Sequence, residues 1–286
     1  MRNQVISLYD YTGEALRPWA EAGYQCFAYD IQHKPDKKGL WGGLDRVETF
    51  WERDGDGGGN IFFIHADLYD PETSLKILAR HNNKVAFLSA FPPCTDLAVS
   101  GAMWWKKKGE ANPDFQTEAS DHVKRCAMVG DAFDCSYYIE NPIGALSRLW
   151  RKPDHKFDPC DFGGYLSEDD VHPRWPEIIP PRDAYRKKTC LWVGNRFKMP
   201  RSNAVAHETI VYDRKDPKKG KNYSPVAGKT GGKSQRTKNI RSATPRGFAK
   251  AVFLANAQYN WVNTEESILG GVRHYGNGVI VKGYID

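Results

Sequence analysis

Apolar residues in the first half of the chain gather in short runs, and longer stretches of mixed character lie between them. The runs predict strands and the stretches predict helices. We expect strands at residues 5–9, 26–29, 61–64, 85–90 and 137–139, and helices at residues 16–22, 71–80 and 116–134. Strands that alternate with helices in this order predict an α/β fold with a doubly wound, mostly parallel sheet.

Other stretches lack this alternation. Residues 33–60 are polar and rich in glycine, which favours an exposed loop. Residues 151–184 contain many prolines and glycines, so we expect an irregular but ordered connection before a further strand at residues 189–193. Thr244 and Pro245 are typical of a helix N-cap and first turn, and they predict a helix that begins there.

The positive charge of the chain is concentrated in one segment. The chain has 286 residues and a formal net charge of +6, but residues 195–246 alone contain 14 Lys and Arg and three acidic residues. Such segregation is typical of a protein that contacts a phosphate backbone, although a solvated, lysine-rich loop has the same composition. We therefore expect a core at residues 1–194, a basic recognition insert at 195–240 and a return to the core at 241–286.

The composition also bears on the cellular compartment of the protein and on its membrane and metal partners. Six cysteines are scattered without short paired spacing, which favours reduced thiols and a cytoplasmic location. No apolar run approaches the length of roughly 20 residues that a bilayer requires, and the chain starts directly with a strand, so we expect no membrane partner and no signal peptide. His155, Cys160 and His172 match no common zinc spacing, so we expect no metal.

Two chemically capable side chains follow predicted strands. Cys94 comes after the strand at residues 85–90, presented by two prolines, and Glu140 ends the strand at residues 137–139. Ligands and reacting groups in open α/β sheets sit at the carboxyl ends of strands, and a thiolate there can attack an electron-poor carbon. A free cysteine is also a common core residue, and the Asn-Pro after Glu140 is a common turn start. The pair nevertheless indicates a site assembled across the sheet.

The order of these pieces resembles the cytosine-C5 DNA methyltransferase family. Pro93 to Gly101 is similar to the family's Pro-Cys-Gln-x-Phe-Ser-x-x-Gly segment, in which the cysteine is the nucleophile. Glu140-Asn141-Pro142 is similar to its Glu-Asn-Val element, and Lys187 keeps a basic residue in the place of its Gln-x-Arg-x-Arg element. Residues 241–251 resemble the helix after its recognition region, and residues 276–279 resemble its last motif.

The resemblance implies a Rossmann-like methyltransferase core that binds S-adenosylmethionine at the ends of the first strands. Asp30 would accept hydrogen bonds from the ribose hydroxyls and Asp67 from the adenine amine, although each alone also suits a turn or a cap. Tyr11 and Glu14 stand where the family has glycines. The residues that the resemblance assigns to the cofactor are Tyr9, Tyr11, Thr12, Gly13, Asp30, Asp67 and Pro92.

The resemblance also implies a reaction and a substrate. Cys94 would attack C6 of a cytosine in duplex DNA so that C5 can accept a methyl group, and Glu140 would hydrogen-bond N3 and the exocyclic amine. Lys187 would lie near the base or the thiolate and favour the anion. The cytosine has to be flipped out of the duplex. Residues 101–113 would form a mobile loop that closes over it, or else an exposed basic loop.

Three other interpretations stay open at this point. The same chemistry on RNA or on a nucleotide is compatible with a recognition insert this short. A DNA-binding protein with impaired catalysis is compatible with the changed residues Tyr11 and Glu14, but it is opposed by the intact Cys94 and Glu140. Transfer of a carbon group other than methyl would use the same nucleophile.

Overall fold

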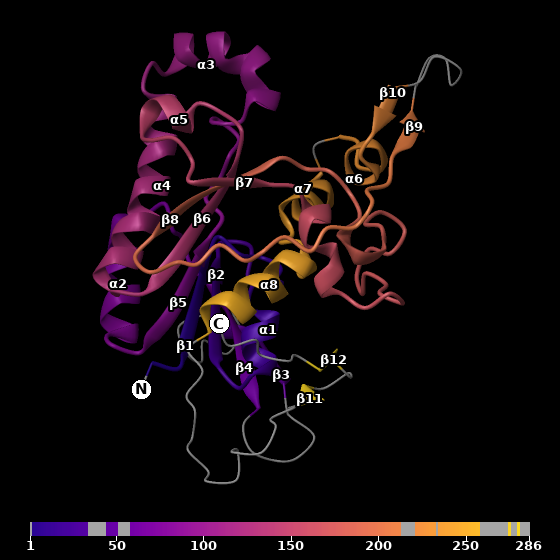
Figure 1. Cartoon of the computed structure of the whole chain (residues 1–286). Coiled ribbons are helices and arrows are strands. Elements are labelled where there is room, and N and C mark those ends of the chain that lie inside the picture. Colours follow the sequence, from indigo (N-terminus) through magenta and orange to yellow (C-terminus); the bar gives the residue numbers. More distant parts are fainter. Residues whose placement is uncertain are drawn as a thin grey trace.

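The computed structural model describes residues 2–33, 44–50, 58–212, 221–232, 234–257, 274–275 and 279–280. An extended sheet forms its centre (Figure 1). The strands of this sheet are β1 (Gln4–Leu8), β2 (Gln25–Asp30), β3 (Leu44–Phe50), β4 (Gly59–His65), β5 (Val85–Ala90), β6 (Ser136–Pro142), β7 (His155–Phe157) and β8 (Thr189–Gly194). Their order across the sheet is β3-β4-β2-β1-β5-β6-β8-β7.

The strand order reverses in the middle of the sheet. From β1 the chain moves outward through β2 to β4 on one side, and through β5 to β6 on the other, and these five strands are parallel. β3 and β8 run antiparallel to β4 and β6, and β7 pairs antiparallel with β8. The predicted α/β class with a mostly parallel sheet is confirmed. Ligands of such sheets bind where the order reverses, here between the carboxyl ends of β1 and β5.

Helices cover both faces of the sheet (Figure 1). Successive residues of a strand point to opposite faces. Ile6 of β1 therefore lies in an apolar cluster with Val123, while Val5 lies in another cluster with Trp19 and Phe248. The first cluster is covered by α2 (Pro71–His81) and α4 (Phe115–Ala132), and the second by α1 (Arg17–Glu21) and α8 (Arg246–Asn256).

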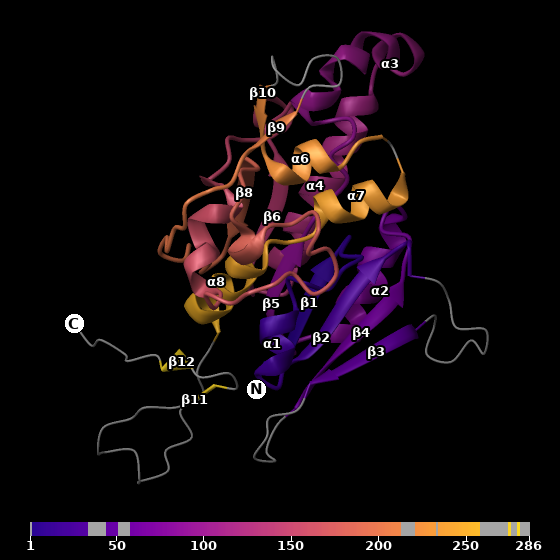
Figure 2. The same cartoon turned by 90° about the vertical axis from the view of Figure 1, so that its right-hand side faces the viewer.

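A smaller part of the chain lies beyond the sheet. Its apolar cluster joins Ile178, Ile179 and Tyr185 of the irregular connection with Val226 and Ile240. We call residues 166–187 and 221–242 the lobe. It contains η3 (Pro181–Asp183), β10 (Lys221–Tyr223), α6 (Pro225–Lys229) and α7 (Gln235–Ser242), and β10 pairs with β9 (Ile210–Tyr212). Figure 2 shows α6 and α7 above one end of the sheet.

The remaining described elements are short. They are η1 (Val99–Trp104), α3 (Trp105–Ala111), α5 (Leu146–Leu149), η2 (Pro159–Tyr165), β11 (His274–Tyr275) and β12 (Val279–Ile280). The predicted irregular connection at residues 151–184 does contain little regular structure, namely β7, η2 and η3. Within the described residues, no helix is both long enough and apolar enough to cross a membrane.

The expected loop at residues 33–60 is wrong in part, because it contains strand β3. This strand pairs antiparallel with β4 at the edge of the sheet, and its register shifts between Leu44 and Arg46. The shift and the charged residues in the segment explain why no clean alternation marked it. Residues 34–43 and 51–57 lie outside the described residues.

The expected loop at residues 101–113 is also wrong in part, because η1 and α3 occupy most of it. A second correction concerns the start of α8. Its N-cap is Pro245 and no side chain caps it locally, so Thr244 is not the cap. A distant group acts instead: the carboxylate of Asp183 accepts a hydrogen bond from Gly247 N (2.9 Å). At the start of α8 a tertiary contact thus replaces the local capping signal.

Candidate functional site

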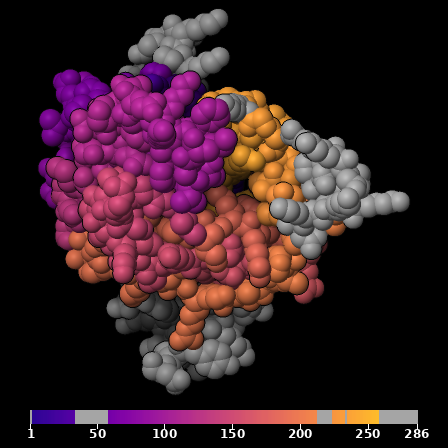
Figure 3. All heavy atoms as spheres, turned by 90° about the horizontal axis from the view of Figure 1, so that it is seen from above, coloured from indigo at the N-terminus to yellow at the C-terminus, as the bar shows by residue number. Residues whose placement is uncertain are grey.

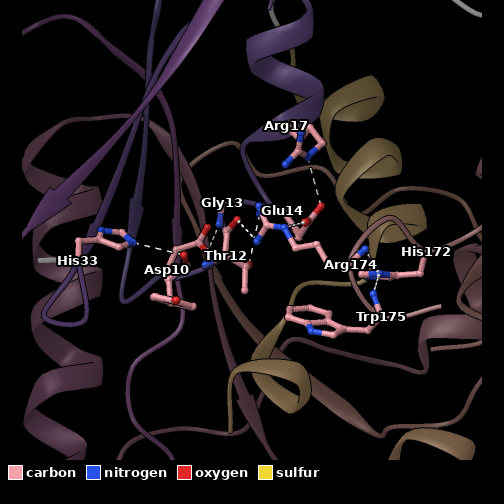
Figure 4. A network of polar contacts seen from close by, with 10 residues as sticks. Asp10, Thr12, Gly13, Glu14, Arg17, His33, His172, Arg174 and Trp175 are labelled. Atoms are coloured by element: carbon pink, nitrogen blue, oxygen red, sulfur yellow. Dashed lines mark hydrogen bonds and ion pairs between the residues drawn. The ribbon is translucent and has the colours of Figure 1, made fainter. Parts of the chain in front are cut away.

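The loop after β1 is a tight turn built around one buried carboxylate. Asp10 Oδ1 accepts hydrogen bonds from Thr12 N (3.0 Å) and Gly13 N (2.8 Å) (Figure 4). Asp10 Oδ2 accepts one from Ser7 Oγ (2.8 Å). Tyr9 has φ +57° and Gly13 has φ +71°. A Cβ at Gly13 would approach the Phe63 ring to 2.8 Å, so this turn requires glycine. The turn places backbone at the reversal of strand order, where a ligand can approach it closely.

The carboxylates at the ends of β2 and β4 lie along the same edge of the sheet. Asp30 is buried, which raises its pKa, and its Oδ1 accepts from Gln32 N (2.7 Å). Asp67 is exposed, and its Oδ1 accepts from Tyr69 N (2.9 Å). Each carboxylate therefore organises its own turn. Whether either also binds a cofactor stays a prediction.

An aromatic pair lies next to these carboxylates. The Tyr11 ring stacks on the His33 ring with centroids 5.8 Å apart, and His33 Nε2 lies 3.3 Å from Tyr11 O. Tyr11 is 37% exposed, so this pair presents a partly open aromatic surface between the loops after β1 and β2. Tyr9 points elsewhere: its hydroxyl donates to Leu68 O (2.9 Å), which ties the loop after β1 to the loop after β4.

Glu14 occupies the end of the turn and connects it to the lobe (Figure 4). Its side chain is fully buried, and burial raises its pKa while Arg17 and Arg174 oppose that rise. Arg17 Nε lies 3.4 Å from Glu14 Oε2, and Arg174 Nε lies 3.6 Å from Glu14 Oε1. Arg174 Nη1 also donates to Thr12 O (3.0 Å). The sequence analysis missed Arg174, because nothing local marks a contact across 162 positions.

A second link joins the lobe to the same edge of the sheet. Gln235 Nε2 of α7 donates to Gln32 Oε1 just after β2 (2.6 Å). His172 holds the other link in place, since its Nδ1 accepts from the backbone N–H groups of Arg174 (3.2 Å) and Trp175 (3.1 Å). The lobe therefore faces the carboxyl ends of β1 and β2.

The segment after β5 is fixed by β6. Asn141 is buried, and its Nδ2 donates to Pro92 O (2.9 Å). Cys94 O then accepts from Leu97 N (3.0 Å) and Ala98 N (2.8 Å), which starts a helical turn. Cys94 itself is half-buried, whereas the five other cysteines are buried. The two prolines and Asn141 thus hold one accessible thiol at the carboxyl end of β5.

Three of the predicted site residues come together at this point. Burial raises the pKa of the Cys94 thiol, the nearby Glu140 carboxylate raises it further, and Lys187 lowers it. Lys187 Nζ lies 3.9 Å from Glu140 Oε1 and donates to Arg241 O (2.7 Å). The thiol is therefore mostly neutral at neutral pH, and its ionisation depends on the balance between one carboxylate and one ammonium group.

A small pocket, open to solvent, adjoins Glu140. Aromatic side chains and hydroxyl groups share its wall, including Phe91, Phe248, Ser242 and Thr244. Glu140 Oε1 is buried without a hydrogen-bond partner among the described residues. A buried acceptor without a partner is costly, so this position suits a hydrogen-bond donor from a bound group.

Basic side chains lie on both sides of the site. Lys106 and Lys107 of α3 are exposed, as are Arg236 and Lys238 of α7. Seen from above, a hollow separates the magenta part of the chain from the orange and yellow part that contains the lobe (Figure 3). The basic segment predicted at residues 195–240 is described only in part, because residues 213–220 and Lys233 lie outside the described residues.

No protein-family model matches this chain, and no curated protein is similar enough to match it. The residues that the structure describes include no group of three or more His, Cys, Asp or Glu that could hold a metal ion. The motif expected at residues 276–279 falls almost entirely outside the described residues. The function must therefore be inferred from the two sets of side chains at the carboxyl edge of the sheet.

Proposed function

We propose that this protein transfers a methyl group from S-adenosylmethionine to C5 of cytosine in DNA, through a covalent bond between Cys94 and C6. The observation that carries the proposal is the meeting of Cys94, Glu140 and Lys187 at the carboxyl ends of β5 and β6. A nucleophile, a carboxyl group and a cation in one place are the groups that this chemistry needs.

In the proposed reaction, Cys94 is the nucleophile and Glu140 stabilises the ring of the base. The Cys94 thiolate forms a bond from Sγ to C6, and the electron pair of the C5–C6 double bond shifts into the ring as an enamine. Glu140 hydrogen-bonds N3 and stabilises the ring as it takes up this charge. When bound, S-adenosylmethionine supplies an electrophilic methyl group for C5. A base then removes the C5 proton, the double bond re-forms and Cys94 Sγ leaves as thiolate.

The ionisation of Cys94 follows from the same arrangement. The Glu140 carboxylate opposes formation of the Cys94 thiolate, and Lys187 favours it. A cytosine that shares a proton between N3 and Glu140 removes the opposing charge. Lys187 is then left to stabilise the thiolate, so binding of the base itself would activate the nucleophile.

The edge formed by β1, β2 and β4 fits the proposed cofactor. The turn from Tyr9 to Gly13 brings backbone close to the reversal of strand order. Asp30 and Asp67 offer carboxylate acceptors for hydroxyl and amine groups, and Tyr11 offers an aromatic face. Pro92 would complete the site from the side of β5.

The test is product analysis of DNA. Duplex DNA of varied sequence is incubated with the protein and S-adenosylmethionine, digested to nucleosides and examined by mass spectrometry. We expect 5-methylcytosine with the wild-type protein and none with Cys94→Ser. A folded RNA in a parallel reaction addresses the alternative substrate, and a cytosine product with a different mass gain addresses the alternative carbon group. Absence of 5-methylcytosine from all DNA samples contradicts the proposal.

A further inference from the structure

A row of buried hydroxyl groups crosses three neighbouring strands in the middle of the sheet. Ser7 of β1 is paired in register with Ser89 of β5, and Ser89 is paired in register with Tyr138 of β6. Residues that are paired in this way point to the same face of a sheet, so the three side chains lie side by side. All three residues are at most 2% exposed. We call them the hydroxyl row.

The hydroxyl row is hydrogen-bonded along its length and ends on one carboxylate. Ser89 Oγ donates to Ser7 Oγ (2.9 Å), and Ser7 Oγ donates to Asp10 Oδ2 (2.8 Å). Tyr138 and Ser89 share a side-chain hydrogen bond. Because a serine hydroxyl carries a single proton, Ser89 accepts from Tyr138 while it donates to Ser7. Donors aligned in this way strengthen one another, and the last bond is charge-assisted.

The two ends of the hydroxyl row lie at the two parts of the proposed site. Tyr138 precedes Glu140 by two residues on β6. Burial and the carboxylates of Asp10 and Glu140 raise the pKa of the Tyr138 hydroxyl, so this hydroxyl keeps its proton and remains a donor. At the other end, Asp10 Oδ1 accepts from Thr12 N and Gly13 N (Figure 4). The row therefore joins the strand that carries Glu140 to the turn after β1.

We propose that the hydroxyl row positions the turn after β1 for S-adenosylmethionine, and that its three residues thereby set the affinity for this cofactor from within the sheet. This inference rests on the proposed function. A carboxylate that is bound through both oxygens holds the backbone N–H groups of the turn in one orientation, so a ligand meets a turn that is already ordered. Ser7, Ser89 and Tyr138 are therefore positioning residues that act through Asp10.

The test is calorimetric titration with S-adenosylhomocysteine, which binds without turnover. Ser7→Ala leaves a buried carboxylate oxygen without its donor and is expected to weaken binding by roughly 5- to 50-fold. Tyr138→Phe removes only the first donor of the row and is expected to weaken binding by about threefold. Because Tyr138 acts through Ser7, the double variant Ser7→Ala/Tyr138→Phe is expected to bind no more weakly than Ser7→Ala alone.

Tyr137→Phe is the matched control. Tyr137 is the neighbour of Tyr138 on β6, but it lies in the apolar cluster on the opposite face of the sheet and shares a side-chain hydrogen bond with Asp131 of α4. Its loss is expected to leave the affinity for S-adenosylhomocysteine unchanged. The rate of Cys94 alkylation is expected to stay within about twofold of wild type in every variant, because the row acts on the cofactor turn.

Three results would overturn the role of the hydroxyl row: wild-type affinity in Ser7→Ala, additive losses in the double variant, or an equal loss in Tyr137→Phe. Should Ser7→Ala not fold, Ser89→Ala alone and combined with Tyr138→Phe gives the same comparison. If the wild type itself does not bind S-adenosylhomocysteine, the proposed function fails and the row fails with it. If only the variants behave otherwise than expected, the row fails and the proposed function stands.

Discussion

Two opposite charges act on the Cys94 thiol, and its reactivity can be measured without any substrate. The Glu140 carboxylate raises the pKa of the thiol and Lys187 lowers it, in addition to the effect of burial. Because the thiolate is the reactive form, alkylation at neutral pH reports this balance directly. The other five cysteines are buried, so the accessible thiol can be followed at the Cys94 peptide.

We predict opposite effects for the two neighbours of Cys94. Glu140→Gln removes the opposing charge and should speed alkylation at pH 7.5 by roughly tenfold, whereas Lys187→Met should slow it by a similar factor. The measurement is the rate of iodoacetamide modification of the Cys94 peptide by mass spectrometry. Lys76→Met, on the far helix α2, is the matched control and should change nothing. Effects of the same sign for both variants contradict the account.

At the scale of single residues, the sequence analysis placed some side chains better than others. Cys94 follows β5 and Glu140 lies near the carboxyl end of β6, and parallel neighbouring strands bring such residues to one edge, so their proximity was predictable. Asp10 carried a weak local signal, since an Asp with a Gly three residues later favours a turn that its own carboxylate organises. Arg174 carried none, because its contact with Thr12 depends on how the lobe folds back.

At the scale of elements, the segment after β5 depends on one close backbone approach. A Cβ on Gly144 would overlap the carbonyl of Leu97, next to the Ala98–Gly144 bridge. This contact fixes the segment that carries Cys94 against the end of β6. A side chain at position 144 would push the two segments apart.

We predict that Gly144→Ala lowers the free energy of unfolding by about 1–3 kcal/mol, because the backbone has to shift to admit the methyl group. Urea denaturation measures this change. Gly109→Ala is the control, since a Cβ there meets only Phe115 at 3.8 Å and lies within α3. It should be neutral or stabilise by up to about 1 kcal/mol. Equal stability of the two variants would show that the close approach at Gly144 has no importance.

The irregular connection has a titratable group at its centre. Burial lowers the pKa of His172 to about 4, and its neutral Nδ1 accepts from two backbone N–H groups. In the unfolded chain the histidine takes up a proton below about pH 6.5. The contribution of His172 to stability is therefore complete above pH 6.5 and is lost as the pH falls from 6.5 toward 4.

His172→Asn keeps an acceptor oxygen but cannot titrate, which makes it the matching variant. We predict that the wild type loses up to about 3 kcal/mol more unfolding free energy than this variant between pH 7 and pH 4. Urea denaturation at a series of pH values gives both curves. Parallel curves would mean that His172 is not held neutral in the folded protein.

Some secondary-structure elements were predicted from the sequence and others were not. Buried parallel strands such as Val85–Ala90 are continuous apolar runs, and these were predicted closely. β3 was missed because an edge strand with an irregular register needs no regular alternation. The start of α8 was misplaced because Asp183 satisfies Gly247 N from a distance, which a local capping rule cannot foresee.

At the scale of the whole molecule, the distribution of positive charge bears on the proposed DNA partner. The excess positive charge lies in residues 195–246, and further exposed lysines lie on α3, which is separate in sequence from that segment. The sequence indicated the first group but not where its described residues Arg236 and Lys238 lie, because that depends on the lobe contacts made by Arg174 and Gln235.

We predict that the affinity of the protein for DNA falls as the salt concentration rises. The steepness of this fall should depend on the exposed lysines of α3. The double variant Lys106→Ala/Lys107→Ala should reduce the slope of log K against log salt by about two, one for each lost phosphate contact. Fluorescence anisotropy between 50 and 200 mM salt, roughly the range over which such effects are large, measures it. Lys76→Ala/Lys84→Ala removes the same charge from exposed positions away from the site and should leave the slope unchanged. Equal slopes for all three proteins contradict a role of α3 in binding.

Covalent attack of Cys94 on cytosine in DNA can be tested by trapping the adduct. DNA that contains 5-fluorocytosine cannot lose its C5 substituent as a proton, so the bond between Cys94 and C6 should persist. With S-adenosylmethionine present, we predict a protein–DNA adduct that survives denaturation, absent with Cys94→Ala and absent without the cofactor. No adduct with the wild type across DNA of varied sequence, or an adduct that survives loss of Cys94, would contradict the account.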